Sequence, residues 1–420
     1  MRRIVLAAAV VSLLVAAFLM LQHRDERAAR DKRQTARLPS FDDRRVTGVV
    51  LETRTATWRL VRTPTGWRVV APVDDVADRR TVESLIGAAE RAPILQTIAA
   101  PDALSTYGLA PPVARLTFDG VAAPTLELGS LAPAGDAVFA RLAGSPAVLL
   151  LGLPGAEPLA GVDPASLRDR SIVDLVRSEL VGLEIASGGP RLSRDADGWW
   201  ITAPRRFPAS PAALDRLLGS LYGAKVVGWD DLGAPSEAKY GFGATAPSIT
   251  LRAASEAQTI TLGAPAGEGK RFVASEGRRT ILIAGAVPPL DAIPLDLARL
   301  RETRLTNVNR YDVTRLVYTA GGARFAATRK DESTWITETG NAIRAERVYT
   351  LLVALLEAET VAWTDGPLKS PPAATLSYAT DKGGAAGGLE FAGESATWDA
   401  LPGVVFRLAS TFPPVPADAP

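Results

Sequence analysis

Residues Gly66-Trp67-Arg68-Val69-Val70 close a hairpin and begin a pattern that the chain repeats. Apolar and polar residues alternate in this stretch and in residues 57–62, on either side of the turn Pro64-Thr65-Gly66. Such a pattern predicts a β-hairpin. After the hairpin, Asp78 is suited to cap an amphipathic helix that runs to about Glu90, so the hairpin is followed by a helix with one apolar face.

A turn and a second group of strands complete this first module. Tyr107-Gly108-Leu109, followed by two prolines, is typical of a turn. Short apolar runs then predict four strands at Ala114–Phe118, Thr125–Leu128, Val138–Leu142 and Ala147–Leu151. The second of these strands ends in Leu128-Gly129. Together these elements predict a mostly antiparallel sheet with one packed helix.

The chain repeats the same order of elements. Tyr107 follows Trp67 by 40 residues, and Tyr240 follows Trp199 by 41. The glycine of each Leu-Gly pair, Gly129 or Gly263, follows its tryptophan by 62 or 64 residues. The segments that link one module to the next, which we call the joints, match as well. Leu167-Arg168 in the first joint and Leu300-Arg301 in the second are 133 residues apart without a gap. A fixed period of this kind predicts duplication.

A third copy begins near Trp335 and continues in a helix from about Ala345 to Ala358. It lacks the Tyr-Gly turn and has Pro371-Pro372 instead, so we expect a degenerate terminal copy. The residues that mark the modules, which we call the signature residues, are expected to be structural; they are Trp67, Tyr107, Gly108, Gly129, Trp199, Tyr240, Gly241, Gly263 and Trp335.

An apolar run at residues 4–21 precedes the modules and is interrupted only by Ser12. As a helix it would span about 27 Å, close to the thickness of the bilayer core. Arg2 and Arg3 before it resemble the start of a signal sequence. We expect an uncleaved signal anchor with the body outside the cytoplasm, although the basic residues that follow the run favour the opposite orientation. A cleaved signal peptide is the alternative.

The sequence therefore predicts an α+β protein with an N-terminal transmembrane helix and three tandem modules. The predicted parts are the anchor 1–23, a charged stalk 24–44, the modules 45–164, 165–297 and 298–412, and a Pro-rich tail 413–420.

Composition excludes several kinds of chemistry. The chain has no Cys, which excludes disulfides, thiolate catalysis and Cys-ligated metals. Its one histidine, His23, lies at the edge of the apolar run, so the modules have no histidine for general-base catalysis or metal binding. The formal net charge of +1 argues against nucleic acid as a partner. We expect no cofactor and no metal.

Three short motifs suggest reactions or ligands, and each has a simpler interpretation. Ser236-Glu237-Ala238-Lys239 fits the S-x-x-K pattern of serine hydrolases but lacks its companion motifs. Residues 263–270 resemble a phosphate loop without the correct glycine or hydroxyl, and we interpret them as a hairpin loop. Asp74, Asp75 and Asp78, like Asp195 and Asp197, could bind calcium but are more typical of turns and caps.

Eight tryptophans raise the possibility of a platform for glycans. Three of them recur at one place in the repeat, which favours core packing. The others are less constrained: Trp58, Trp200, Trp229, Trp363 and Trp398. A glycan-binding protein of the cell envelope is therefore the alternative function, and an envelope hydrolase that uses Ser236 and Lys239 is a third.

The hairpin, the turn and the strand end together resemble a known bacterial family, the domain of unknown function 4340. The resemblance covers most of residues 45–300, through Trp67-Arg68-Val69, residues 107–112 and 126–130, and their second copies. It implies a single-pass inner-membrane protein with its bulk in the periplasm. Members of this family are often encoded beside a gliding-motility-type ABC transporter and its large extracytoplasmic auxiliary subunit. The resemblance therefore also implies a non-enzymatic accessory or scaffold role in an ABC-type transporter complex, with the permease and that auxiliary subunit as partners. No catalytic residues are implied.

Overall fold

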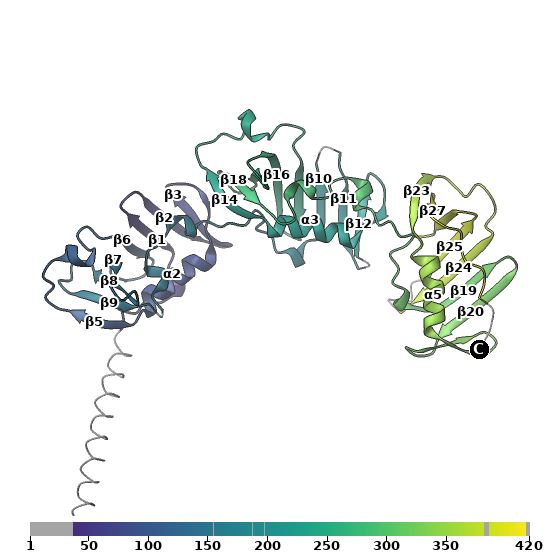
Figure 1. The fold of residues 1–420 in the computed structure, drawn as a ribbon, viewed down its shortest axis with the longest axis horizontal. Helices are drawn as coiled ribbons and strands as arrows, with labels where there is room; N and C mark the ends of the chain where they lie inside the picture. Colours follow the sequence, from purple (N-terminus) through teal and green to yellow (C-terminus); the bar gives the residue numbers. More distant parts are fainter. Residues whose placement is uncertain (1–36, 154, 187, 197, 382–385, 417–420) are drawn as a thin grey trace, which may run out of the picture. The chain divides into compact units, whose positions relative to one another are not determined.

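The computed structural model describes residues 37–416, apart from 154, 187, 197 and 382–385 (Figure 1). The chain divides into two compact units. The first holds the residues up to Ser171 together with Val226–Pro235 and Glu276–Ile283, and the second holds Ile172–Lys225, Ser236–Ser275 and the residues from Ala284 onward. Three nine-stranded sheets follow one another along the chain.

The first sheet has the strand order β4-β3-β2-β1-β6-β7-β8-β9-β5. Neighbouring strands pair antiparallel, and the predicted hairpin is formed by β2 and β3. The strands are β1 (Gly48–Thr53), β2 (Thr57–Thr63), β3 (Gly66–Ala71), β4 (Asp75–Val76), β5 (Ile94–Ile98), β6 (Ala114–Asp119), β7 (Leu126–Leu131), β8 (Ala137–Leu142) and β9 (Val148–Gly152).

Helix α2 (Arg79–Arg91) packs on the first sheet, as its apolar spacing predicts. The side chain of Asp78 caps the helix by accepting a hydrogen bond from the Thr81 backbone N–H at 2.7 Å. Val82, Leu85 and Ile86 are buried in one core with residues of β1, β2 and β6. Because burying a large aliphatic side chain contributes about 1.5–3 kcal/mol, this face is a main source of the sheet's stability.

The second sheet repeats that order as β13-β12-β11-β10-β15-β16-β17-β18-β14. Its helix α3 (Pro211–Gly223) is capped by Ser210, the equivalent of Asp78. The strands are β10 (Gly182–Ile185), β11 (Arg191–Asp195), β12 (Gly198–Ala203), β13 (Phe207–Pro208), β14 (Lys225–Asp230), β15 (Ser248–Arg252), β16 (Ala257–Pro265), β17 (Lys270–Ser275) and β18 (Ile281–Gly285).

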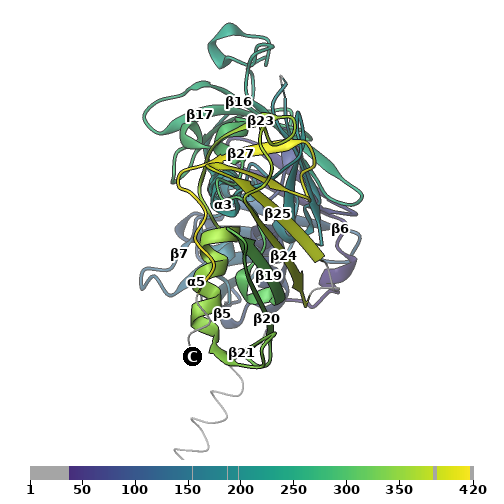
Figure 2. The same cartoon turned by 90° about the vertical axis from the view of Figure 1, so that its right-hand side faces the viewer.

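The third sheet has the same order again, β22-β21-β20-β19-β24-β25-β26-β27-β23. Helix α5 (Ala345–Leu356) lies against this sheet, beside β19, β24 and β25 (Figure 2). The strands are β19 (Val313–Ala320), β20 (Ala323–Arg329), β21 (Thr334–Thr337), β22 (Ala342–Arg344), β23 (Thr360–Asp365), β24 (Ala374–Thr380), β25 (Ala386–Ala392), β26 (Ser395–Trp398) and β27 (Val404–Leu408). The third copy thus differs in sequence but keeps the strand order.

These observations confirm three antiparallel sheets in tandem, in a structure that is mostly sheet. The predicted transmembrane helix at residues 4–21 lies outside the described residues, and no helix between residues 37 and 416 is apolar and long enough to cross a membrane. Sequence patterns missed the edge strands on both sides of each sheet. β4 and β13 have two residues each, too few for a period-2 pattern to be recognised.

Candidate functional site

The Tyr-Gly turn and the Leu-Gly strand end, far apart in sequence, meet in the first two sheets. Tyr107 ends the 3-10 helix η2 (Leu104–Tyr107), and Gly108 follows with φ 68°. A Cβ on Gly129 would overlap the carbonyl oxygen of Tyr107. Only glycine allows this close approach, because it has no Cβ. The signature glycines therefore serve the packing of one turn on one strand.

The second sheet repeats this contact. Gly241 has φ 69°, and a Cβ on Gly263 would overlap the carbonyl oxygen of Tyr240. In the third sheet the strand register places Ala392 where Gly129 lies, since Phe391 pairs with Ala374 as Leu128 pairs with Ala114. The third copy has no Tyr-Gly turn, so the position that the turn would crowd can hold an alanine.

The three signature tryptophans occupy equivalent strand positions, each opposite an arginine of the neighbouring strand. Trp67 and Trp335 are buried, as core packing requires, but Trp199 is only half-buried. In the second sheet the next residue, Trp200, is buried instead. Its ring stacks on Trp398 with a centroid separation of 6.1 Å, and the guanidinium of Arg206 lies 4.2 Å from its centroid.

The joint that follows the first sheet contains the most deeply buried charges of the first unit. Arg168 is 4% exposed, and its Nε donates to Oδ2 of Asp75, which is fully buried, at 2.8 Å. Its two terminal nitrogens donate to both carboxylate oxygens of Asp231, at 2.8 and 2.7 Å. Arg168 therefore connects strand β4 to the segment that follows β14.

A second arginine completes this group, which we call the joint cluster: Asp75, Arg168, Asp231 and Arg278. Nη1 of Arg278 lies 3.7 Å from Oδ1 of Asp75 and donates to the backbone carbonyl of Asp169 at 3.0 Å. Burial opposes ionisation of Asp231, but hydrogen bonds from Arg168 and Thr280 outweigh it and hold the pKa of Asp231 below its usual value. Nη2 of Arg278 also lies 3.9 Å from Oδ1 of Asp169, so the two arginines face three carboxylates, of which Asp75 is the fully buried one.

The joint backbone is hydrogen-bonded on both sides. On one side, Asp78 N donates to Leu167 O at 2.8 Å and Asp169 N donates to Val76 O at 3.0 Å, so the joint extends the edge at β4. On the other side, Val226 N in β14 donates to Arg170 O at 2.8 Å. A single segment is therefore hydrogen-bonded both at the β4 edge and to β14.

The second joint has the same backbone bonds but a different side-chain partner. Ser210 N donates to Leu300 O at 2.8 Å, and Thr360 N donates to Thr303 O at 2.8 Å. Arg301 is the equivalent of Arg168, and the residue equivalent to Asp75 is Phe207. The guanidinium of Arg301 lies 5.6 Å from the Phe207 ring centroid, a cation–π contact in place of an ion pair.

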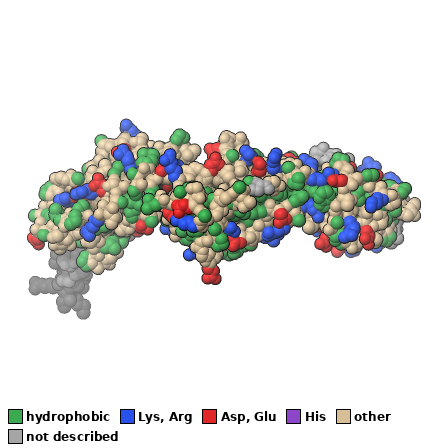
Figure 3. All heavy atoms as spheres, turned by 90° about the horizontal axis from the view of Figure 1, so that it is seen from above, with side chains coloured by type: hydrophobic (Ala, Val, Ile, Leu, Met, Phe, Trp, Pro, Cys, Tyr) green, Lys and Arg blue, Asp and Glu red, His purple; other side chains and the backbone are tan. Residues whose placement is uncertain are grey.

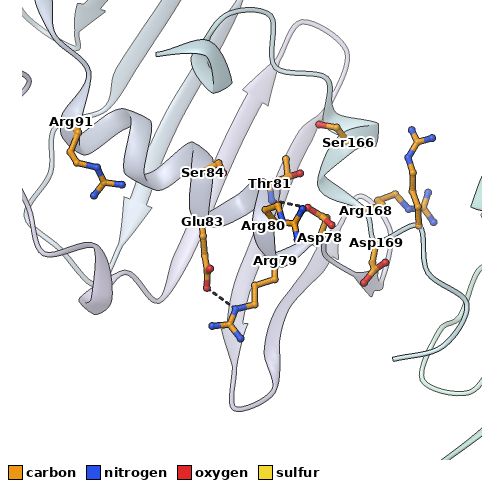
Figure 4. Close-up of a pocket in the computed structure, with 11 residues that line it drawn as sticks. Asp78, Arg79, Arg80, Thr81, Glu83, Ser84, Arg91, Ser166, Arg168 and Asp169 are labelled. Carbon is orange, nitrogen blue, oxygen red and sulfur yellow. Dashed lines mark hydrogen bonds and ion pairs between the residues drawn. The ribbon is translucent and has the colours of Figure 1, made fainter. Parts of the chain in front are cut away.

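A surface hollow of about 920 Å³ lies beside the joint cluster (Figure 4). It is open to solvent at the start of α2, where Arg79 pairs with Glu83 at 2.8 Å. Its other side is formed by residues 166–170. Around this hollow the charged groups are mixed in sign, as they are over the face of the molecule in Figure 3.

The serine–lysine pair is not arranged for catalysis. Ser236 and Lys239 are both exposed, and Nζ of Lys239 lies 3.2 Å from a carboxylate oxygen of Glu237. Hydrogen bonds to Tyr240 and Glu237 raise the pKa of Lys239 above its usual value. A lysine that activates serine needs a lowered pKa, so the arrangement has the wrong electrostatics for that role.

The aspartates considered as calcium ligands lie in ion pairs and a helix cap, in line with the simpler interpretation. Asp74 binds Arg68 at 2.5 Å, and this hydrogen bond lowers the pKa of its carboxyl group. Asp75 belongs to the joint cluster, Asp78 caps α2, and Asp195 lies 3.8 Å from Arg206. Asp197 lies outside the described residues. Between residues 37 and 416, no group of three or more acidic or histidine side chains could hold a metal ion.

The phosphate-loop-like segment connects β16 to β17, which confirms that it is a hairpin loop. The five tryptophans considered as a glycan platform are all buried or half-buried. Trp229 lies under the guanidinium of Arg168, 4.5 Å from its ring centroid, and Trp363 packs on Phe207 at 5.0 Å. Trp398 donates a hydrogen bond from Nε1 to the hydroxyl of Tyr378 at 3.0 Å. These rings serve the joints and cores.

The sequence pointed to the joints through their spacing, but it did not reveal the joint cluster. The recurrence of Leu-Arg at residues 167–168 and 300–301 was visible. The partners of Arg168 come from positions 93 and 63 residues away, and they have no counterpart in the second joint. A repeat pattern cannot identify partners that occur in only one copy.

Comparison with known proteins identifies the family. The family described as Domain of unknown function (DUF4340) matches the chain twice, over residues 67–198 and 199–379. No curated protein matches the chain. The two matches meet at the signature tryptophan Trp199 and together cover more than half of the sequence. The chain therefore belongs to the DUF4340 family.

Proposed function

We propose that this protein is a non-enzymatic accessory or scaffold subunit of an ABC-type transporter complex, anchored in the bacterial inner membrane with its sheets in the periplasm. The observation that carries the proposal is the repetition of one nine-stranded sheet three times, with joints that are hydrogen-bonded on both sides. Repeated modules suit a protein that presents surfaces to partners.

Two further considerations support this role. Among the described residues, Lys239 and the aspartates considered as calcium ligands take part in caps and ion pairs, and the tryptophans considered for glycan binding pack in joints and cores. The resemblance to the DUF4340 family implies, through the neighbourhood of its genes, a permease and a large extracytoplasmic auxiliary subunit as partners. The apolar run at residues 4–21 supports a membrane anchor, because it has the length and hydrophobicity of a membrane span.

Co-purification tests the proposal. The tagged full-length protein is extracted from its native membranes in mild detergent, and the proteins that accompany it are identified by mass spectrometry. We expect an ABC permease and a large membrane-anchored auxiliary protein at similar abundance. A matched control carries the same tag on an unrelated single-pass protein of the same membrane. Equal recovery of the transporter with the control, or none with the tagged protein, would contradict the proposal.

A further inference from the structure

The third sheet differs from the first two at one edge. In the first, second and third sheets, the edge strand before the helix is β4, β13 and β22, respectively. The helix N-cap that follows this strand is Asp78, Ser210 and Arg344, respectively. In the first two sheets this edge is covered: Asp75 and Phe207, three residues before the N-caps, are both fully buried, and the equivalent residue in the third sheet is Asn341. In the third sheet Asn341, Ala342 and Arg344 are all exposed.

The cover in the first two sheets is a segment that follows the last strand. Leu167 and Leu300, both buried, accept hydrogen bonds from the backbone N–H of the two N-caps. The acidic residue two positions later, Asp169 or Glu302, donates its backbone N–H to Val76 or Pro208. Both covering segments therefore contain Leu-Arg followed by an acidic residue. No described residue makes the equivalent bonds with β22.

One face of the helix is exposed together with that edge. α2 contacts the 3-10 helices η3 (Glu157–Leu159) and η4 (Pro164–Leu167), and α3 contacts the short helix α4 (Leu297–Leu300). The exposed fraction of the tenth residue after each N-cap shows whether this face of the helix is covered. Ala88 is 5% exposed and Ser220 is fully buried, whereas the equivalent Ala354 is exposed and its neighbour Val353 is 39% exposed.

Strand geometry shows which backbone groups are available. Ile343 pairs with Trp335, and Arg344 pairs with Thr334. Ala345 N donates to Ser333 O, so these two residues form a hydrogen-bonded pair. Because such pairs alternate along an antiparallel ladder, Arg344 and Thr334 do not exchange hydrogen bonds, and the N–H of Arg344 points away from β21. The N–H of Asp78 points outward in the same way in the first sheet. The β22 edge thus offers the groups that the first two sheets use to bind their covering segments.

We propose, building on the scaffold function above, that the β22 edge and the adjoining face of α5 bind an extended segment of a partner protein that carries Leu-Arg followed by Asp or Glu. The segment adds a strand to the sheet, which is a common mode of peptide recognition. Its leucine covers Ala354 and Val353. Its acidic residue lies beside Arg344, and the side-chain oxygen of Asn341 accepts from its arginine, at the position that Asp75 occupies in the first sheet.

A peptide that copies the second joint provides the test. A fluorescent peptide of residues 289–303 is titrated against the full-length protein in detergent, and binding is followed by fluorescence anisotropy. We expect saturable binding. The same peptide with Leu300→Ala and Arg301→Ala serves as the matched control and should bind at least tenfold more weakly, since it loses its buried side chain and its charge.

Arg344→Pro shows where the peptide binds. This change removes the outward N–H, and because Arg344 has φ −63° proline fits the backbone without strain. We expect about tenfold weaker binding from the lost hydrogen bond, whereas Arg344→Ala, which keeps the N–H, should retain backbone-dependent binding. Circular dichroism and thermal unfolding establish that both variants are folded.

Other outcomes would overturn this assignment. Absence of saturable binding to the wild type, or equal binding to Arg344→Pro and Arg344→Ala, would exclude the edge as a peptide site. Self-association that is lost in Arg344→Pro would make a second copy of the chain the occupant, and binding only after removal of residues 417–420 would make it the chain's own tail.

If the peptide fails to bind but the transporter still co-purifies, only the docking edge is wrong; if the peptide binds and no transporter co-purifies, the transporter role is wrong.

Discussion

Arg168 and Asp75 form an ion pair that is almost completely removed from water, with 2.8 Å between Nε and Oδ2. They belong to segments that are 93 residues apart in the sequence, strand β4 and the joint after the first sheet. Taking two charges out of water is costly, so such a pair adds little net stability, but removing one partner leaves an uncompensated charge. The pair therefore favours one specific arrangement of the joint.

Asp75→Ala should destabilise the first unit by about 3–5 kcal/mol, because it removes the fully buried carboxylate that faces both Arg168 and Arg278. Hydrogen exchange measured by mass spectrometry should show faster exchange in residues 75–78 and 166–170. Asp74→Ala is the matched control, since that carboxylate is 32% exposed and its ion pairs contribute less than about 1 kcal/mol. Equal effects of the two changes would show that the joint cluster does not hold the joint.

Gly263→Ala should lower the stability of the second sheet by about 1–3 kcal/mol, because the added methyl group overlaps the carbonyl oxygen of Tyr240. The reverse change at the equivalent position of the third sheet, Ala392→Gly, should cost only about 0.5–1 kcal/mol through backbone entropy. Urea unfolding followed by tryptophan fluorescence measures both. A tolerated Gly263→Ala would mean that the Tyr-Gly turn can move away from the strand.

Acid should weaken the fold through carboxylates with lowered pKa values. Burial opposes ionisation of Glu127, but hydrogen bonds from Arg141 and Arg115 at 2.7 and 3.1 Å hold its pKa below the usual 4.5. The pKa of Asp231 is likewise below its usual 3.8. Because these groups bind protons more readily in the unfolded chain, their stabilisation is complete above the unfolded pKa and is lost as the pH falls through the folded pKa.

The urea midpoint should therefore be constant above pH about 5 and fall steadily below pH about 4.5. Glu127→Gln removes one of the titrating groups, so its midpoint should depend less steeply on pH over that range, whatever its absolute stability. A midpoint that does not change between pH 6 and 3 would show that these ion pairs contribute no pH dependence.

Ser236→Ala should not change the labelling of the full-length protein by a fluorophosphonate probe. Lys239 is held protonated by its neighbours, so it cannot accept the proton of the serine hydroxyl. The expected result is the same weak background in both proteins. Labelling of the wild type that disappears in the variant would establish a reactive serine and would favour the hydrolase hypothesis.

The sequence predicted the repeated sheet, its hairpin and its helix, because these features depend on local periodicity. Asp78 was recognisable as a cap for the same reason. It did not predict β4 and β13, since two-residue strands exist only through pairing with the rest of the sheet. The joint cluster was also missed, because its partners come from three distant segments and the equivalent of Asp75 in the next copy is Phe207. Trp199 was expected in the core, but its neighbour Trp200 is the buried residue.

The composition of the transporter complex shows whether this protein acts as a scaffold. A tagged ABC permease is purified in mild detergent from cells that contain this protein and from cells in which its gene is deleted, and the accompanying subunits are quantified by mass spectrometry together with transport activity. A scaffold role predicts that the large auxiliary subunit is lost or strongly reduced in the deletion strain, with reduced activity, and that both return when the gene is restored. Unchanged composition and unchanged activity without this protein would contradict the account.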